Sequence, residues 1–446
     1  MKMPSFRYAG LTSLAFFALT PTAMANMGNI GTNYGVLPGD VASAQALSLF
    51  NSDVSATYYN PAYLAHDERG ELTLGLLHAE HDLRISSQGG AAPLGRSSDV
   101  IQDTPSQQTL IGMKTNLSSL TKSEHPIYFG FIAGVEKYGE EMLAFNSSTS
   151  NSGQYFSYGR QPLFLNLGGA TEVLRGIDVG LTARVTLHAD AELYAYTDLQ
   201  GNTSLESLNV SAKPSIRPVF GMNVNWAETF CGGGDCLFDG IETALSFRGH
   251  SNTETKVEAT TIIPGTIPAP GLNLAIATLD AYQPDITSLG MLYRSDRWRL
   301  GLTLEYQAWS DLSDEFESDT IKDQANLNFQ DVLIPRLGGE FRVNDMLTLT
   351  GGVAFQESPL EGKRSLDVNY LDADRTLIGL GATLELRDPP VLAYPLSLSF
   401  GYQYQMIDER DFELTSTDPM VPVNPYETVT TEGDVSVFSG SMTMKF

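Results

Sequence analysis

The chain has 446 residues, of which 42% are hydrophobic, 10% aromatic and only 18% charged. It holds 27 Lys and Arg against 53 Asp and Glu, a formal net charge of −26 at pH 7. This acidic excess argues against nucleic acid as a partner, because phosphate binding needs a basic face. The hydrophobic content argues against a disordered chain, and no segment has the roughly 18 uninterrupted apolar residues of a membrane-spanning helix. The length admits two or three domains, or one large β-barrel.

The first 25 residues have the pattern of a processed export signal. Lys2 and Arg7 form a short basic start, residues 11–19 are apolar apart from two hydroxyl residues, and residues 23–25 form a small-x-small cleavage site. An N-terminal anchor helix would need a longer apolar core. We expect a mature chain that begins near Asn26. The loss of two basic and no acidic residues leaves 25 against 53, a net charge of −28.

Residues 26–65 match neither strands nor a solvated loop. They hold little charge, and small residues run through positions 40–47. A disordered tail is the alternative, but the segment is too apolar for that at Leu47, Leu49, Phe50, Tyr58 and Tyr59. We expect a compact segment that acts as a plug if the strands after it enclose a lumen.

From Glu71 onward, apolar and polar residues alternate in runs of roughly ten or more. In residues 298–308 one face carries Trp298, Leu300, Leu302, Leu304, Tyr306 and Ala308, and the other carries Arg299, Gly301, Thr303, Glu305 and Gln307. Alternation is typical of half-buried strands, but strands of a soluble β-sandwich average about five or six residues. Longer runs with aromatic ends are typical of strands that cross a bilayer. Because lipid tolerates no open sheet edge, we predict an all-β transmembrane barrel.

Fourteen antiparallel strands are expected, an even number as in single-chain bacterial barrels. The predicted strands are residues 71–86, 107–116, 127–138, 161–173, 176–192, 205–226, 241–258, 284–295, 298–310, 333–343, 346–357, 375–387, 395–411 and 434–446. Short turns on the periplasmic side then alternate with long outer connections, the asymmetry of outer-membrane barrels. The final residue, Phe446, ends an alternating strand and resembles the assembly signal of such barrels.

Cys231 and Cys236 are the two cysteines of the chain, separated by Gly-Gly-Gly-Asp. Export implies an oxidising compartment in which thiols pair. A metal site is the alternative, but two thiols and one carboxylate are too few ligands. We therefore predict a small structural disulfide at the periplasmic turn before the seventh strand.

Two of the long outer connections, residues 139–160 and 259–283, are apolar. An outer loop in water should be polar, so an apolar one suggests a surface that captures apolar ligands. The alternative is that these side chains fold inward onto the plug or other loops. The candidate capture residues are Phe145, Tyr155, Phe156, Ile262, Ile263, Leu272, Leu274 and Ile276.

Patterns for catalysis are missing from the sequence. It has no GxSxG, HExxH or P-loop, and a Ser near one of six scattered His is expected by chance in a lumen rich in Ser and Thr. We expect no enzyme, no cofactor and no metal site. The acidic residues 311–319 suit a solvated loop better than a divalent cation site. The lumen charges Arg184, Glu305 and Glu385 are expected to pair with one another or with the plug, although Arg184 is also placed to meet a substrate carboxylate.

Asn60-Pro61-Ala62 carries a family resemblance. An acidic residue and aromatics precede it in residues 53–59, and the first strand follows directly. This arrangement resembles the N-terminal hatch of the FadL family, outer-membrane transporters of long-chain fatty acids with relatives that admit aromatic hydrocarbons. Pro61 biases Asn60 towards an extended conformation. We expect the Asn60 amide to be tied to a carbonyl of the barrel wall, with an ordinary Asn-Pro turn as the alternative.

The resemblance spans residues 26–446 in architecture, with residue matching confined to the hatch. It implies a signal peptide in residues 1–25, a hatch in residues 26–65 and a transmembrane β-barrel in residues 66–446. It implies passive uptake of hydrophobic compounds, either fatty acids or aromatic and aliphatic hydrocarbons, by a monomer among the lipid and lipopolysaccharide of the bacterial outer membrane. It also implies lateral exit through an inward kink in the third strand.

Gly130 and Gly134 face inward on that strand and are the candidate kink residues. Barrels also use glycine merely to relieve curvature. A second class of function stays open, a water-filled general porin or a structural barrel, although a porin would not need a plug of about forty residues.

Overall fold

The computed structural model describes residues 30–88, 105–123, 125–137, 163–197, 203–232, 236–263, 267–317, 328–364, 372–413, 420, 422 and 428–446. The predicted export signal lies outside these residues, as do the capture candidates Phe145, Tyr155 and Phe156. None of the helices in the described ranges is long and apolar enough to cross a membrane.

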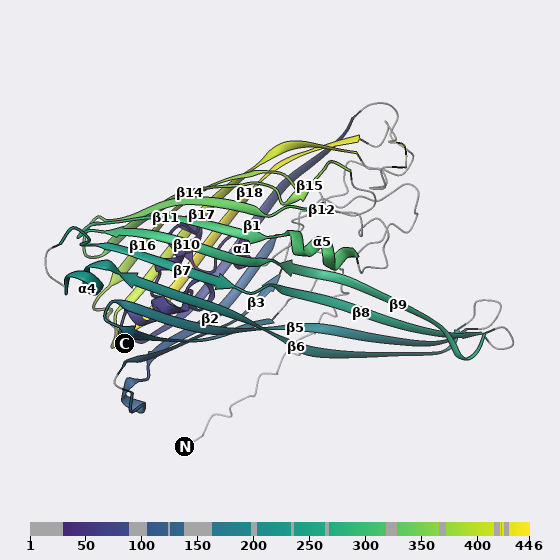
Figure 1. The fold of residues 1–446 in the computed structure, drawn as a ribbon, viewed down its shortest axis with the longest axis horizontal. Coiled ribbons are helices and arrows are strands. Elements are labelled where there is room, and N and C mark those ends of the chain that lie inside the picture. Colours follow the sequence, from purple (N-terminus) through teal and green to yellow (C-terminus); the bar gives the residue numbers. More distant parts are fainter. Residues whose placement is uncertain are drawn as a thin grey trace, which may run out of the picture.

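Fourteen strands form a closed antiparallel barrel, as the alternation predicts (Figure 1). The ring closes where β1 pairs with β18, and Phe446 exchanges two backbone hydrogen bonds of 2.8 Å with Gly70 beside that seam. The strands are β1 (Glu71–Gln88), β2 (Ser106–Asn116), β3 (Ile127–Lys137), β4 (Leu163–Leu174), β5 (Ile177–Thr197), β6 (Thr203–Asn225), β7 (Ile241–Arg248), β10 (Asp285–Arg294), β11 (Trp298–Ala308), β13 (Val332–Arg342), β14 (Leu347–Gln356), β16 (Arg375–Leu386), β17 (Leu396–Glu413) and β18 (Thr428–Lys445).

The two ends of the barrel differ as expected. One end carries the short connections, together with η3 (Ser118–Leu120) and α4 (Trp226–Cys231). Cys231 and Cys236 form the predicted disulfide between α4 and β7. The other end carries α5 (Ser310–Glu317), where we expected a solvated loop, and a small sheet of β12 (Asn328–Phe329) and β15 (Leu360–Glu361). By the usual asymmetry of such barrels, the short-turn end faces the periplasm.

Residues 259–283 are not a loop, contrary to the prediction. They belong to β8 (Ser251–Ile263) and β9 (Ile267–Gln283), an antiparallel hairpin that continues β7 and leads into β10. The expected strand 241–258 is therefore broken at residues 249–250. Figure 1 shows β8 and β9 running outward beside the ends of β5 and β6. We call this four-stranded extension, which consists of β8, β9 and the adjoining ends of β5 and β6, the arm.

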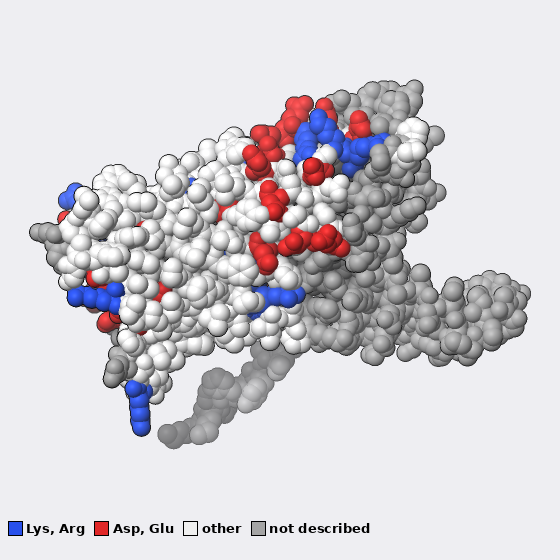
Figure 2. Space-filling view, viewed as in Figure 1, with Lys and Arg blue, Asp and Glu red and all other residues white. Residues whose placement is uncertain are grey.

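Apolar side chains on the outer face of the strands form a belt around the barrel. Figure 2 shows a broad uncharged band, with the charges gathered towards its ends. Leu302 and Leu337 in this band are 46% and 57% exposed, while Thr303 and Arg336 beside them in sequence face inward and are buried. Successive residues of a strand point to opposite faces, so the alternation produces a lipid-facing belt and a polar inner wall.

Residues 30–66, which we call the lumen segment, lie inside the barrel in the place expected of a plug. The segment contains α2, which packs against β14, β16, β17 and β18, and η2, which packs against β3 to β6 on the other side. It therefore bridges the lumen. Its elements are α1 (Ile30–Asn33), α2 (Pro38–Ala42), η1 (Ser48–Phe50), α3 (Ala56–Tyr59) and η2 (Pro61–His66).

Candidate functional site

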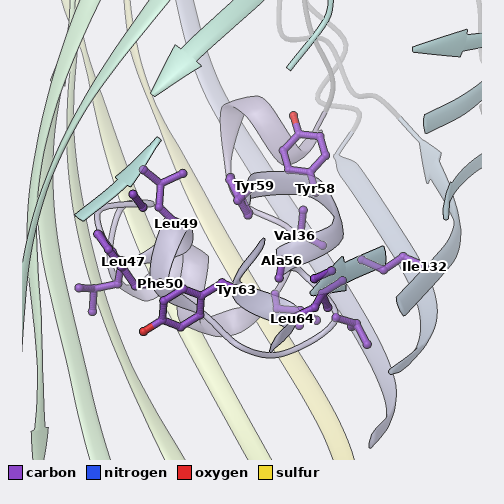
Figure 3. Packing of buried hydrophobic residues seen from close by; sticks show 14 of the residues in the cluster. Val36, Leu47, Leu49, Phe50, Ala56, Tyr58, Tyr59, Tyr63, Leu64 and Ile132 are labelled. Atoms are coloured by element: carbon purple, nitrogen blue, oxygen red, sulfur yellow. The ribbon is translucent and has the colours of Figure 1, made fainter. Parts of the chain in front are cut away.

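The lumen segment and the barrel wall share one apolar core, shown in part in Figure 3. Phe50 and Tyr63 pack edge to face with ring centroids 5.9 Å apart. Leu110, Ile132 and Leu292 of the wall belong to the same cluster. Burial of each large apolar side chain contributes about 1.5–3 kcal/mol. The segment is therefore held in the lumen by far more than one or two polar contacts.

The inner wall carries glycines, which have no side chains, where the lumen segment lies against it. On twelve of the fourteen barrel strands, a Cβ added to a glycine would come within 3.3 Å of a lumen-segment atom. These are Gly75, Gly112, Gly130, Gly168, Gly180, Gly221, Gly290, Gly301, Gly338, Gly352, Gly379, Gly381 and Gly401, with two of them on β16. On β7, Ser246 takes the equivalent place and its hydroxyl donates to the Tyr59 carbonyl. The barrel is thus shaped to the backbone of the segment.

The Asn60-Pro61-Ala62 motif sits against two of these glycines. Gly180 and Gly221 are directly opposite each other on β5 and β6. An added Cβ at Gly180 would overlap the backbone of Pro61 and Ala62, and one at Gly221 would overlap Oδ1 of Asn60. The motif therefore docks on a bare stretch of wall that any larger residue would fill.

The amide of Asn60 is not tied to the wall, so that prediction was wrong. Its Nδ2 donates to the Leu49 carbonyl at 2.9 Å, within the lumen segment. The acceptor is thus a backbone carbonyl of the segment itself and not one of β5 or β6. Asn60 is extended as Pro61 requires, with φ −153° and ψ 90°. The residue joins two turns of the segment.

Two arginines, Arg184 and Arg248, pack on the lumen segment on its side away from the periplasm. The Arg184 guanidinium is 5.0 Å from the ring centroid of Tyr58, and that of Arg248 lies 5.0 and 5.3 Å from the rings of Tyr58 and Tyr59. Cation–π contacts are stronger when water is excluded, and both arginines are buried. These contacts fix the aromatic pair that precedes Asn60.

Glu305 joins Arg248 to Arg336 in a buried triad. Its carboxylate oxygens lie 2.5 Å from Arg248 Nη2 and 3.1 Å from Arg336 Nη2, and Arg336 Nη1 donates to the Ala44 carbonyl at 3.0 Å. The triad therefore ties three wall strands to the lumen segment. Arg184, Glu305 and Glu385 do not pair with one another, which was one of the two expected arrangements, whereas Arg184 does contact the lumen segment, the other. Arg184 stacks on Tyr58 and Phe164 instead, and Glu385 is exposed.

A second set of polar contacts lies on the periplasmic side of the segment. The Tyr63 hydroxyl donates to Glu242 at 2.7 Å and accepts from Arg294 at 2.8 Å. Lys114 Nζ donates to the Ser52 carbonyl at 2.7 Å. On its periplasmic side, the segment is therefore joined to the wall by polar and charged groups. An apolar molecule that moved from the lumen to the periplasm would have to displace them.

Asp40 organises the first half of the segment. Its carboxylate accepts from Leu37 N at 2.9 Å, Ser48 Oγ at 2.7 Å and Asn51 Nδ2 at 3.0 Å. Burial, with a further contribution from the charge of Asp53, raises the pKa of Asp40 to about 7. Within the described residues, no three His, Cys, Asp or Glu side chains are grouped to hold a metal ion.

The candidate kink residues lie in a strand with regular pairing. β3 pairs without a register shift with β2 from Tyr128 to Lys137 and with β4 from Ile127 to Val135. Gly130 faces Thr57 and Leu64 of the lumen segment, and Gly134 faces Phe164. Ile262 and Ile263 lie at the end of β8, while Leu272, Leu274 and Ile276 lie in β9. The capture candidates among the described residues are therefore in the arm, away from Asn60.

The geometry defines a class of protein, a transmembrane barrel filled by its own N-terminal segment. The model of the family described as outer membrane protein transport protein (OMPP1/FadL/TodX) matches residues 38–446. The chain therefore belongs to this family of outer-membrane transport channels, which are not enzymes.

Relatives agree with this assignment. Alkane uptake protein A of Marinobacter nauticus is 50% identical over 435 residues, which cover 96% of this chain and 94% of that protein. A FadL homologue of Pseudomonas aeruginosa has a similar structure, with a TM-score of 0.56, 16% identity and coverage of 95% of this chain and 99% of that one. The monoaromatic hydrocarbon channel CymD matches with a TM-score of 0.53, 12% identity and coverage of 94% and 99%. These two structures establish the shared fold alone.

Proposed function

We propose that this protein takes up alkanes across the outer membrane by passive diffusion, with lateral exit into the bilayer. The observation that carries the substrate class is the 50% identity with an alkane uptake protein along almost the whole chain. The relatives with aromatic substrates in their names share only the fold at 12% identity or less. Aliphatic hydrocarbons are therefore favoured over aromatic ones and over fatty acids.

The filled lumen argues against the alternative of a water-filled porin. The lumen segment bridges opposite walls and contacts glycines on twelve strands. A porin needs a polar channel through the barrel. A segment that fits the wall closely would block such a polar channel. The same close fit is expected of a channel that must exclude water.

Passive movement needs no further source of energy for such a substrate. Transfer of an alkane out of water is favourable by about 0.8 kcal/mol for each CH₂ group. A molecule that reaches the apolar side of the wall therefore gains free energy by entering the bilayer. A route straight into the periplasm would instead cross the polar contacts around Tyr63, Glu242 and Arg294. This contrast supports lateral exit.

The exit is proposed at β3, where Gly130 and Gly134 bring no side chains to the inner face. Because β3 is fully paired on both sides, exit requires it to separate from β2 or β4. Ile111 and Ala133 are partners across β2–β3, and Phe131 and Leu167 are partners across β3–β4. Antiparallel partners are close enough for a disulfide between introduced cysteines.

We expect one of two disulfide ties, made separately by Ile111→Cys with Ala133→Cys or by Phe131→Cys with Leu167→Cys, to lower uptake at least tenfold. Uptake of radiolabelled hexadecane by cells is the measurement, and a reductant should restore it. Leu337→Cys with Val353→Cys, partners on the opposite wall, is the matched control and should change nothing. Wild-type uptake with both ties oxidised would overturn the exit at β3.

A further inference from the structure

One inward glycine near the proposed exit is not covered by the lumen segment. On the inner face of β2, β3 and β4, a Cβ added to Gly112, Gly130 or Gly168 would come within 3.3 Å of a side chain of that segment. Gly134 differs, because the nearest atoms to a Cβ added there are Cε1 and Cζ of Phe164 on β4, at 2.6 Å. The tip of this ring therefore lies on the bare backbone of β3, and a side chain of the wall itself covers the gap.

The ladder explains why the ring lies there. Gly134 and Phe164 are direct partners across β3 and β4, and Leu110 on β2 is the partner of Gly134 on its other side. Partners across a ladder share a face, so the three residues form one row of the inner wall. Leu110 and Phe164 are buried, with 1% and 3% of their surface exposed, and both belong to the core that the wall shares with the lumen segment. The row is apolar, and its middle position has no side chain of its own.

The inward positions of β3 on either side of Gly134 do carry side chains. Towards the outer end, Glu136 accepts from Gln108 Nε2 of β2 at 3.0 Å, and both residues are buried. Towards the periplasm, Ile132 is fully buried in the shared core. On the lipid side of the strand, the neighbour of Gly134 is the small residue Ala133. The wall is therefore thinnest at Gly134, where an apolar molecule meets the Phe164 ring before it meets β3.

Arg184 joins the Phe164 ring to the lumen segment. Its guanidinium carbon lies 5.7 Å from the ring centroid of Phe164 and 5.0 Å from that of Tyr58. Cation–π contacts of a desolvated cation are stronger than exposed ones, and Arg184 is buried. The position of the Phe164 ring is therefore tied, through one guanidinium group, to the position of Tyr58 in the lumen segment.

We propose that Phe164 is the gate of the exit at β3 and that Arg184 is the residue that positions it. The ring bridges β3 and β4 on the inner face, so the two strands separate at Gly134 only after a change of rotamer has carried the ring away. The gap that this uncovers is apolar and no wider than a single missing side chain. It passes a linear hydrocarbon chain and excludes a branched one. The gate deepens the proposed function and rests on it for the place of the exit.

The test compares cellular uptake of a linear and a branched alkane, radiolabelled hexadecane and pristane. Phe164→Ala removes the ring and should raise pristane uptake at least tenfold, while hexadecane uptake stays at or above the wild-type rate. Phe164→Leu keeps an apolar side chain without the ring and should give an intermediate ratio. A loss of folded protein would instead lower the uptake of both alkanes. Leu292→Ala, which shortens a buried side chain of the same core on β10, is the matched control and should leave the ratio unchanged.

The role of Arg184 is tested by two substitutions and one combination. Arg184→Gln removes the cation and should raise the ratio of pristane to hexadecane uptake, in the same direction as Phe164→Ala. Arg184→Lys keeps a cation near the two rings and should retain the wild-type ratio. In the Phe164→Ala background, Arg184→Gln should add nothing, because a positioning residue acts only through the side chain that it positions.

Three outcomes would count against the gate. A wild-type ratio in Phe164→Ala, with hexadecane uptake intact and equal amounts of folded barrel, would overturn it and leave the proposed function standing. An additive effect of Arg184→Gln on top of Phe164→Ala would overturn the positioning role of Arg184. If wild-type cells take up hexadecane no faster than cells without the chain, the proposed function fails and the gate fails with it.

Discussion

Replacement of Gly221 by leucine is expected to unseat the lumen segment and open the barrel to water. A Cβ at this position already overlaps Oδ1 of Asn60, and the rest of a leucine side chain would occupy the place of Pro61. Overpacking of a tight interior costs about 1–3 kcal/mol, and here the wall strand is fixed by its ladder with β5 and β7. The segment, which is not part of the barrel sheet, is the element that must move.

The measurement is single-channel conductance in planar bilayers, together with the sensitivity of cells to a large hydrophilic antibiotic. Gly221→Leu should give a steady conductance where the wild type gives none. Gly440→Leu is the matched control, since nothing lies within 4 Å of a Cβ added at Gly440. If neither variant conducts ions at equal amounts in the membrane, the close fit between Gly221 and Asn60 does not hold the lumen closed.

Replacement of Glu305 by alanine is expected to produce a large loss of stability. It leaves Arg248 and Arg336 buried without the carboxylate between them. Breaking a buried ion pair by removing one partner costs about 3–5 kcal/mol, because the remaining charge stays buried. Arg336 also donates to the Ala44 carbonyl, so the lumen segment should loosen with the wall.

Heat modifiability on an electrophoresis gel measures this effect, since a folded barrel migrates differently from an unfolded one. Glu305→Ala should unfold at a clearly lower temperature than the wild type. Asp82→Ala removes an exposed carboxylate that pairs with Arg84 on β1, and exposed pairs contribute about 0–1 kcal/mol. Equal transitions for the two variants would show that the triad contributes no more than a surface pair.

The barrel could be predicted because lipid and lumen impose opposite requirements on alternate residues. Residues 298–308 illustrate this: the predicted strand 298–310 and the observed β11, Trp298–Ala308, differ only at one end. The position of the lumen segment could also be predicted from the sequence, since its aromatic residues precede the first strand and need an apolar environment. Both predictions depend on local composition, which the sequence displays directly.

The arm could not be predicted because its pairing is non-local. Residues 259–283 were expected to be an outer connection, and they contain Pro268 and Pro270, although proline donates no ladder hydrogen bond. In the structure they fall between the paired residues Ile267 and Leu272, where the register with β8 shifts. β9 pairs only with β8, so proline is tolerated in it as in other edge strands. The exchange of β4 for β8 beside β5 leaves no local sequence signal.

The contacts of the candidate site could be predicted from the sequence only in part. Glycines on the inner face of many strands are visible in the sequence, yet only Gly130 and Gly134 were singled out, from family resemblance. That Gly180 and Gly221 oppose each other depends on the β5–β6 register, and their contact with Asn60 depends on the path of the segment. Likewise, the partners of Glu305 come from β7 and β13, 57 and 31 residues away.

The central claim is that the barrel is closed to water and ions while it admits alkanes. The most direct test measures both properties of the wild-type protein: ion conductance of the purified barrel in planar bilayers, and uptake of radiolabelled hexadecane by cells with and without the chain. We expect conductance at the background of a protein-free bilayer and faster hexadecane uptake in cells that contain the protein. A steady porin-like conductance, or equal hexadecane uptake in the two kinds of cell, would contradict the account.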